Sequence, residues 1–242
     1  MQQSFRIFGL VVAFAAAFAL VPPAGAADDK DEGWIPLFNG KDLTGWKMVN
    51  PPAGNFKSVK EKKNDEGKVI AFIGVLKNDK EVTLWQVKDG LIVGGGPASH
   101  LFTDTEADNF RYRVEVKIND KGNSGQYFRT KFEPGFPSGY EAQINATHGD
   151  PIRSGSLYPA GKLGKFKKEI CVMNQAPIKP DEFYTQEVVA DGNHIQIFVN
   201  GNKTIDFTDT TNSFTKGHFA LQGHDPGSVM TFKKVEYKPI KK

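Results

Sequence analysis

Polar and hydrophobic residues alternate with a period of two along much of the chain. The clearest example is FRYRVEVKIN, residues 110–119, in which every second side chain is apolar. A less regular alternation runs through residues 83–95, 186–207 and 228–240. Because successive side chains of a strand point to opposite faces, this pattern predicts strands with one buried face.

Turn residues separate these segments. Asp89-Gly90, Asp191-Gly192-Asn193 and Asn200-Gly201 each stand between two strand-like runs, which predicts tight hairpins. Gly and Pro account for 25 and 14 of the 242 residues, and no window has the period of a long helix. The chain is therefore predicted to be all-β, a sandwich with many turns.

We expect a single domain from about residue 33 to residue 240. The length suits one sizeable domain, and neither a repeat of fixed period nor a low-complexity linker divides the sequence. Residues 48–80 are the least regular region, in which Pro51-Pro52 and the charged run KEKKNDEGK precede the apolar VIAFIGVL. This region is interpreted as an elaborated hairpin or loop of the same domain.

Residues 1–26 have the features of a secretory signal peptide. Arg6 supplies a positive start, residues 7–21 are apolar, and Ala24-Gly25-Ala26 forms a small-residue cleavage site. The apolar run is shorter than the roughly 20 residues of a membrane-spanning helix, so no membrane span is expected. The mature protein is expected to be exported, either to the periplasm or to the extracellular space.

Charge and motif content exclude several classes of function. The formal net charge of +3 falls to +2 without Arg6, which argues against a nucleic-acid binder. The sequence contains no phosphate-binding loop, HExxH, CxxC or GxSxG motif. It also lacks the E-x-D-x-x-E triplet expected of a sandwich glucanase, which counts against an ordinary retaining glycosidase.

Two predicted strands carry polar side chains on one face. In GYEAQIN, the alternation places Glu141, Gln143 and Asn145 together, opposite three apolar residues. In GNSGQYFR, Tyr127 and Arg129 are two residues apart and are also expected to share a face. Each set alone is more typical of a cross-strand surface pair than of a ligand contact. Together they suggest a solvated concave face.

Further polar residues lie in turns and near the C-terminus. ATHGDP places His148 and Asp150 in a turn, and GHFALQGHDPG carries Gln222 and, just past the strand pattern, His224. With the two polar strand faces, these residues suit a sugar-binding groove, where hydroxyls need donors and acceptors together. The other histidines are interpreted as structural or incidental: His218, His100 and His194.

The order of motifs resembles that of the 3-keto-disaccharide hydrolase family. GWIPLFNGKDLTGWK, residues 33–47, is similar to the opening signature of that family. Seven further motifs follow in the same order: LWQVKDGLIVGGG, NFRYRVEVKI, NSGQYFR, GYEAQIN, SGSLY, VADGNHIQIFVNG and GHFALQGHDPGSVMTFKKVEY. The resemblance covers nearly the whole mature chain and implies a concanavalin A-like jelly-roll sandwich of two antiparallel sheets. Residues 48–80 are longer than the usual connection and are expected to reshape one rim of the groove.

The resemblance also implies an activity on small carbohydrates. The substrate would be a glycoside whose glucosyl unit already carries a ketone at carbon 3. That ketone acidifies the proton on carbon 2, so the glycosidic oxygen on carbon 1 can leave by β-elimination. Water then adds to the product, and the net result is hydrolysis. This chemistry needs a general base, a group that stabilises the enolate oxygen, and an acid for the leaving oxygen.

The implied activity assigns hypothetical roles to the polar residues. His224 or Glu141 is the general base, Arg129 stabilises the enolate oxygen, and His148 is a reserve acid or base. The residues expected to bind substrate are Tyr127, Gln143, Gln222, Asn145 and Asp150. A divalent metal held by Glu141, His148 or Asp150 would fit these ligand types, although no spacing in the sequence assigns it.

A different class of function fits the same fold. A non-catalytic, lectin-like carbohydrate-binding module would use similar polar faces, because fold alone does not determine function. That alternative predicts saturable binding of unoxidised glycans and no product from keto-sugars.

Overall fold

The structure, a computed structural model, describes residues 33–241. The predicted signal peptide, residues 1–26, lies outside the described residues. Those that are described belong to one compact unit that starts at Gly33. Within this part of the chain, no helix has the length and apolar character needed to cross a membrane.

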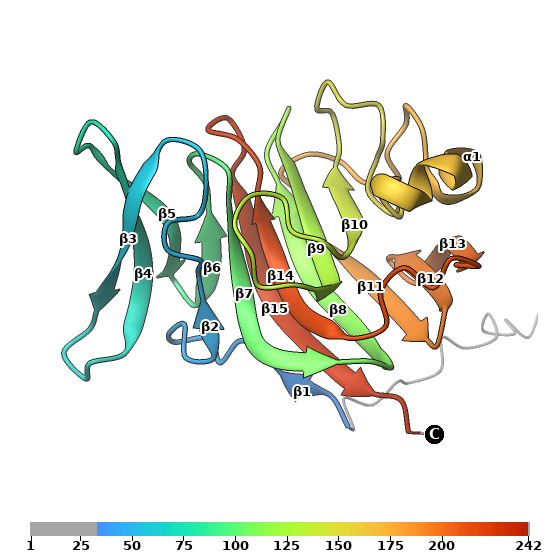
Figure 1. The fold of residues 1–242 in the computed structure, drawn as a ribbon, viewed down its shortest axis with the longest axis horizontal. Coiled ribbons are helices and arrows are strands. Elements are labelled where there is room, and N and C mark those ends of the chain that lie inside the picture. Colours follow the sequence, from blue (N-terminus) through green and yellow to red (C-terminus); the bar gives the residue numbers. More distant parts are fainter. Residues whose placement is uncertain (1–32, 242) are drawn as a thin grey trace, which may run out of the picture. The chain divides into compact units, whose positions relative to one another are not determined.

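Two antiparallel sheets pack into a jelly-roll sandwich, as predicted (Figure 1). The larger sheet has the order β13-β12-β11-β8-β15-β6-β5-β4-β3, and β1 pairs with β15. Its strands are β1 (Ile35–Pro36), β3 (Phe56–Lys63), β4 (Val69–Leu76), β5 (Glu81–Lys88), β6 (Leu91–Gly94), β8 (Phe110–Ile118), β11 (Tyr184–Asp191), β12 (His194–Val199), β13 (Asn202–Thr208) and β15 (Met230–Pro239).

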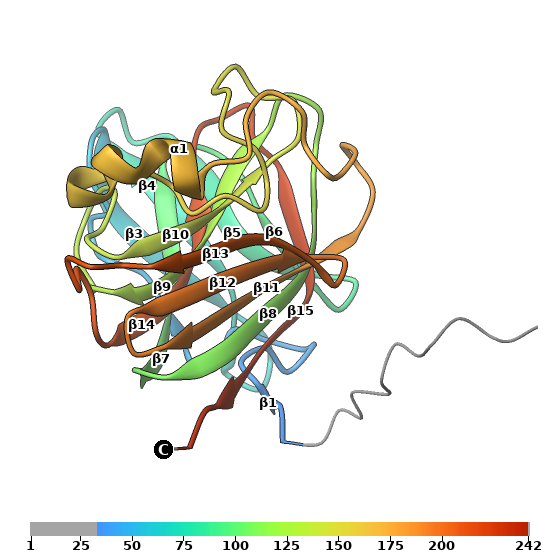
Figure 2. The ribbon, with the colours of Figure 1, turned by 90° about the vertical axis from the view of Figure 1, so that its right-hand side faces the viewer.

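The smaller sheet has five strands in the order β10-β9-β14-β7-β2. Its strands are β2 (Trp46–Lys47), β7 (Ser99–Ala107), β9 (Asn123–Thr130), β10 (Tyr140–Asn145) and β14 (Gly217–Gly223). After β10, a long connection contains the 3₁₀ turn η1 (Gly161–Phe166) and the short helix α1 (Lys167–Ile170), which Figure 2 shows above the strands.

The core lies between the sheets and follows from the alternation in the sequence. In β8, Val114 and Val116 are fully buried, whereas Glu115 between them is half-buried. They share one hydrophobic cluster with Phe128 of β9 and Leu221 of β14, which come from the opposite sheet. Burying these side chains stabilises the fold by about 1.5–3 kcal/mol each. The smaller sheet therefore has one face on the core and a second face available for a site.

The predicted hairpins are confirmed. Their turns at Asp89, Asp191 and Asn200 connect β5 to β6, β11 to β12 and β12 to β13. Residues 48–80 supply the β3–β4 hairpin at one edge of the larger sheet. The start of this region reaches the smaller sheet, because Val49 packs against a cluster on its outer face. The carbonyl of Pro52 accepts a hydrogen bond from the backbone of Gly135 (3.1 Å). The region thus supports the loop after β9.

Candidate active site

A cavity of about 280 Å³ opens on the outer face of the smaller sheet, the face turned away from the core. Strands β9, β10 and β14 supply its polar wall, and the loops that follow β9 and β10 supply its rim. We call it the first cavity. Its lining residues are Asn123, Tyr127, Phe136, Pro137, Gly139, Glu141, Gln143, Tyr158, Ala160, Gln222 and His224. Five residues predicted from the sequence therefore meet in one place: Tyr127, Glu141, Gln143, Gln222 and His224.

Glu141 lies in the polar wall because β10 alternates as predicted. Tyr140, Ala142 and Ile144 belong to the core cluster, so Glu141 points to the opposite face. Its partner in the register is Tyr127 of β9, whose hydroxyl donates to Glu141 Oε2 (2.7 Å).

Two amides complete the network around this carboxyl group. The side chain of Gln222 donates to the Tyr127 hydroxyl (3.2 Å). With its amide oriented to suit its neighbours, Gln143 donates to Glu141 Oε1 (3.1 Å) and to the carbonyl of Ser124 (2.8 Å). Three strands thus fix the position of a single carboxyl group.

Burial changes the protonation of Glu141. Only 7% of the residue is exposed, and loss of hydration raises its pKa to about 8, with a further contribution from the nearby charge of Asp150. Hydrogen bonds from Tyr127 and Gln222 oppose the shift without cancelling it. At neutral pH Glu141 is therefore mainly an uncharged acid that carries a proton to donate.

Gly125 makes room for this carboxyl group. It faces Gln143 across the β9–β10 register, and a Cβ atom there would lie 2.4 Å from Glu141 Oε1. We expect Gly125→Ala to displace Glu141 and to lower the free energy of unfolding by about 1–3 kcal/mol in denaturant titration. The matched control is Gly149→Ala in the following loop, where a Cβ meets nothing within 4 Å. Equal stability of the two variants would contradict this packing.

His224 stands at the end of β14, where it forms a pair with its neighbour Asp225. The distance between His224 Nδ1 and Asp225 Oδ2 is 2.8 Å. Burial alone would raise the pKa of Asp225, but hydrogen bonds from His224, Ser228 and the backbone of Gly227 hold it below its ordinary value. An ionised Asp225 fixes the proton of neutral His224 on Nδ1. The Nε2 atom of His224, which lines the cavity, then has a lone pair that can accept a proton.

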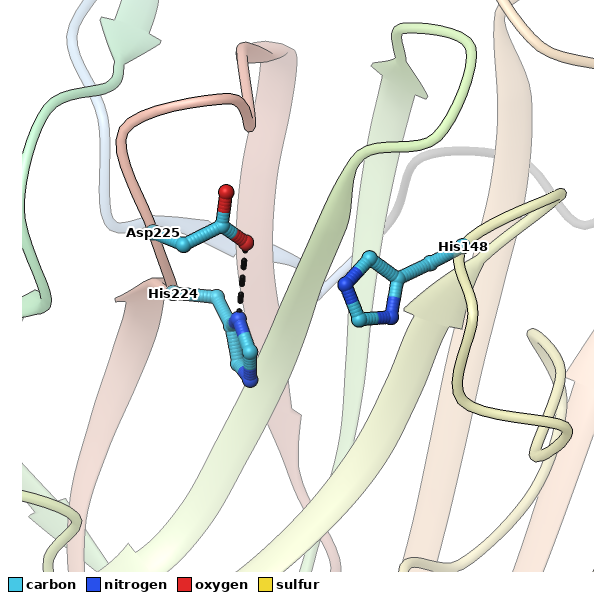
Figure 3. Close-up of side chains that lie close together, drawn as sticks. All are labelled: His148, His224 and Asp225. Carbon is cyan, nitrogen blue, oxygen red and sulfur yellow. Dashed lines mark hydrogen bonds and ion pairs between the residues drawn. The ribbon is translucent and has the colours of Figure 1, made fainter.

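His148 lies beside this pair without lining the first cavity. Its ring centroid is 5.5 Å from that of His224, and Figure 3 shows the ring directed toward the His224–Asp225 pair. The backbone N–H of Asp150 donates to His148 Nδ1 (3.1 Å). Because a backbone N–H can only donate, a neutral His148 carries its proton on Nε2.

Nitrogen and oxygen atoms of His148, His224 and Asp225 lie within 4.8 Å of one another, which raises the question of a metal site. The hydrogen bonds fit such a site poorly. A ligating imidazole must offer a lone pair, whereas the contact with Asp150 leaves His148 with a protonated Nε2. The carboxylate of Asp225 already accepts from His224 and Ser228. Hydrogen bonding accounts for this cluster better than metal coordination does.

Two residues predicted to bind substrate instead shape the loop after β10. The amide of Asn145 donates to the carbonyls of Asp150 and Ile152, and its oxygen accepts from the backbone of His148. Asp150 accepts from the Tyr158 hydroxyl (2.9 Å) and so holds Tyr158, which does line the cavity. Asn145 and Asp150 are absent from the lining, so their predicted direct contact with substrate is not supported.

The structure does not place Arg129 in the first cavity, and the expectation that it shares a face with Tyr127 is wrong. His218 of β14 pairs with Thr130 of β9, and Ala220 pairs with Tyr127, so β14 advances by two positions where β9 advances by three. This bulge breaks the alternation, and Arg129 adopts a left-handed backbone conformation with φ of 49°.

The displaced side chain of Arg129 is 1% exposed and lies over the core ring of Phe110. It donates to the carbonyls of Asp108, Gly192 (2.7 Å) and Phe214 (3.1 Å). Arg129 therefore ties three connections together, and the predicted contact with an enolate does not fit its position.

Sequence reasoning also missed residues of the site. His100 lies in strand β7 and is buried edge-on against Tyr127 (5.2 Å between ring centroids) and Phe136 (5.6 Å). Burial, with a smaller effect of His224, lowers its pKa to about 3, so it is a neutral support for both rings. Phe136 and Tyr158 come from loops, where no periodicity reveals which side chains turn toward a site.

Two polar atoms among the lining residues have no hydrogen-bond partner within the described residues. They are Asn123 Oδ1 and Gln222 Oε1, and both are buried. Leaving such an acceptor unpaired costs about 1–3 kcal/mol. These two side-chain amides therefore keep hydrogen-bonding capacity that the described residues do not use.

Solved structures share this fold at low sequence identity. A candidate glycosyl hydrolase from Parabacteroides distasonis matches with a TM-score of 0.56 and 24% identity, covering 90% of this chain and 99% of that one. A second from the same organism has a TM-score of 0.59 and 20% identity over 86% of this chain and 99% of that one. The β-glucanase of Bacillus licheniformis matches with a TM-score of 0.54 and 13% identity, over 86% and 99%. These similarities establish the fold.

A family model supplies the more specific result. No curated protein matches the chain. Residues 33–241 match the model of the 3-keto-alpha-glucoside-1,2-lyase-like domain, and this range includes every strand described above. The resemblance seen in the order of motifs is confirmed. The chain belongs to the 3-keto-alpha-glucoside-1,2-lyase-like family, a family of carbohydrate-active proteins.

Proposed function

We propose that the protein cleaves 3-keto-glucosides by β-elimination followed by addition of water. The observation that carries the proposal is the pairing of two opposite functions in one cavity. His224 offers a lone pair to accept a proton, and the buried, uncharged Glu141, held by Tyr127, offers a donor for a developing negative charge. Abstraction of a proton next to a ketone needs both at once.

The proposed first step removes the proton on carbon 2. Nε2 of His224 takes this proton, and the electron pair of the C–H bond moves to form an enolate between carbons 2 and 3. The charge on the oxygen at carbon 3 is stabilised by the acid proton of neutral Glu141, and the Tyr127 hydroxyl supports this group by donating to Glu141 Oε2. An uncharged carboxyl group beside a tyrosine is an established arrangement for this task in another enzyme, ketosteroid isomerase.

The second step expels the glycosidic oxygen from carbon 1. The enolate electrons return to form a double bond between carbons 1 and 2, and the leaving oxygen needs a proton. His224, which now holds the carbon-2 proton on Nε2 as an imidazolium and lines the first cavity, is the acid that we assign to this step. Water then adds at carbon 1, carbon 2 regains a proton, and 3-keto-glucose results.

This assignment replaces two hypotheses drawn from the sequence. Arg129 leaves the mechanism because its guanidinium is committed to backbone carbonyls. Between the two candidates for the general base, the structure favours His224, because the raised pKa of Glu141 makes it an acid at neutral pH.

The direct test is incubation of purified protein with a 3-keto-glucoside, with release of 3-keto-glucose followed by mass spectrometry. The unsaturated 3-keto intermediate should appear before the hydrated product, with the mass of the glucose product less one water. A parallel titration with the unoxidised glucoside tests the lectin-like alternative. Saturable binding of that sugar, without any product from the keto-sugar, would overturn the proposal.

The pH dependence of turnover separates an acidic Glu141 from a basic one. Tyr127, Asp150 and Tyr158 are the titratable groups whose charges act on Glu141. As an acid, Glu141 must be protonated, so we expect kcat to fall as the pH rises through about 8. Glu141→Gln keeps an uncharged donor and cannot ionise, so its alkaline decline should disappear. A kcat that instead rises through this pH range would make Glu141 the base.

Export remains a proposal that rests on the sequence of residues 1–26. We expect expression in a bacterial host with an intact secretory pathway to yield a periplasmic protein that begins near Ala27. Intact-mass measurement of the purified protein tests this, and a cytoplasmic product that retains residues 1–26 would contradict it.

A further inference from the structure

A second cavity, of about 410 Å³, borders the first on the side of η1. The two share Phe136, Pro137, Gly139 and Ala160, which form the ridge between them. We propose that the second cavity binds the aglycone of the substrate and that this aglycone is aromatic. The inference rests on the proposed function, which places the glucosyl ring in the first cavity.

The two cavities differ in the chemistry of their walls. The first presents a carboxyl group, three side-chain amides and an imidazole, which are the groups that bind sugar hydroxyls. The lining of the second, within the described residues, contains no Asp, Glu, Asn, Gln, Arg or His. Its polar side chains are Ser138, Ser213 and Lys162. A hexose would leave most of its hydroxyl groups without partners there, whereas an apolar ring would not.

Two phenylalanines supply the apolar surface of the second cavity. Phe136 is 59% exposed, although its edge contacts hold it against His100 and His224 (5.6 and 5.8 Å between ring centroids). Phe214 is fixed edge-on against Tyr140 (5.0 Å). Preorganised aromatic rings of this kind bind a further ring in stacked or edge-on geometry at little cost in conformational entropy.

The position of the ridge matches the bond that would be broken. His224 contacts Phe136 and lines the first cavity, so the proton-accepting ring stands next to the boundary between the two cavities. A substrate that spans this boundary places its sugar against Glu141 and its aglycone beyond Phe136, with the glycosidic oxygen between them.

The test compares three α-glucosides oxidised at carbon 3, with methyl, benzyl and glucosyl aglycones. Benzyl and sugar alcohols are both unactivated leaving groups, so differences in binding are not masked by leaving-group reactivity. One stacked phenyl ring is expected to lower KM about tenfold for the benzyl substrate relative to the methyl substrate. Equal KM values for these two, or a lower KM for the glucosyl substrate, would overturn the inference.

Three variants test whether the second cavity causes the difference in KM between the benzyl and methyl substrates. Phe136→Ala removes the stacking surface and Ser138→Trp fills the second cavity, and each should reduce the tenfold ratio to about one. The matched control is Phe132→Ala, because Phe132 is in the same loop and 42% exposed but lines neither cavity. The Phe132→Ala variant should keep the tenfold ratio of KM values between the methyl and benzyl substrates. A ratio that survives both Phe136→Ala and Ser138→Trp would exclude the second cavity as its source.

Binding of unoxidised benzyl and methyl α-glucosides, measured by calorimetry, separates this inference from the proposed function. If keto-sugars give no product but the benzyl glucoside still binds about tenfold tighter, the proposed reaction fails and the aromatic subsite stands. If keto-sugars are cleaved and neither KM nor Kd depends on the benzyl group, the subsite fails and the reaction stands.

Discussion

Replacing His224 with Ala is expected to lower kcat on a 3-keto-glucoside by about 10³-fold, with the fold intact. The variant removes the group that we propose as the acceptor of the carbon-2 proton, and positioned general bases contribute about 10²–10⁴-fold. Stopped-flow or discontinuous assays of product release measure the loss. Asp225→Asn should cause a smaller loss of about 10²-fold, because the ring remains but its proton is no longer fixed on Nδ1.

The matched control for His224 is His194→Ala. His194 is an exposed histidine paired with Asp206 on the larger sheet, remote in sequence from the residues of the first cavity. Its removal should leave kcat within twofold of the wild type. If His224→Ala retained wild-type turnover while Glu141→Gln lost it, the general base would be Glu141.

Replacing Arg129 with Met is expected to lower the free energy of unfolding by about 4 kcal/mol. The substitution preserves much of the apolar stem but leaves the carbonyls of Asp108, Gly192 and Phe214 without their charged donor. Each buried acceptor left unpaired costs about 1–3 kcal/mol. Chemical denaturation monitored by tryptophan fluorescence measures the loss.

The activity of the same variant tests whether Arg129 has a chemical role. Turnover per folded molecule should stay close to that of the wild type, since the guanidinium does not line the first cavity. The control is Lys216→Met, because Lys216 is an exposed cation that lines the same surface cavity as Arg129. Its loss should change the free energy of unfolding by less than about 0.5 kcal/mol. An Arg129→Met protein with normal stability and no turnover would restore the enolate-binding hypothesis.

Period-two alternation predicted most of the fold and, within the candidate site, the positions of Glu141 and Gln143. Turn residues located the hairpins. The alternation placed Glu141 and Gln143 on the face opposite Tyr140 and Ala142, because β10 has no irregularity. The same argument failed at Arg129, two residues beyond Tyr127. A bulge is set by how neighbouring strands pair, and its effect on a side chain cannot be read from the spacing within one strand.

Loops were the other limit of prediction. Phe136 and Tyr158 reach the site from loops, through contacts between segments that are distant in sequence. Asp150 was predicted to bind substrate, but it accepts a hydrogen bond from Tyr158 and so positions that residue, without lining the cavity itself. Local sequence patterns describe which face a residue takes, and they contain little information about which segments fold over that face.

The loop after β9 offers an independent control over substrate choice. The acid–base residues lie on strands or at a strand end, whereas Phe136, Pro137 and Ser138 lie in a loop propped on the backbone of Pro52. If the proposed function holds, mutant libraries confined to residues 132–138 are expected to change the preferred aglycone while the elimination chemistry stays constant. In such a scaffold, selectivity and reactivity can evolve as separate traits.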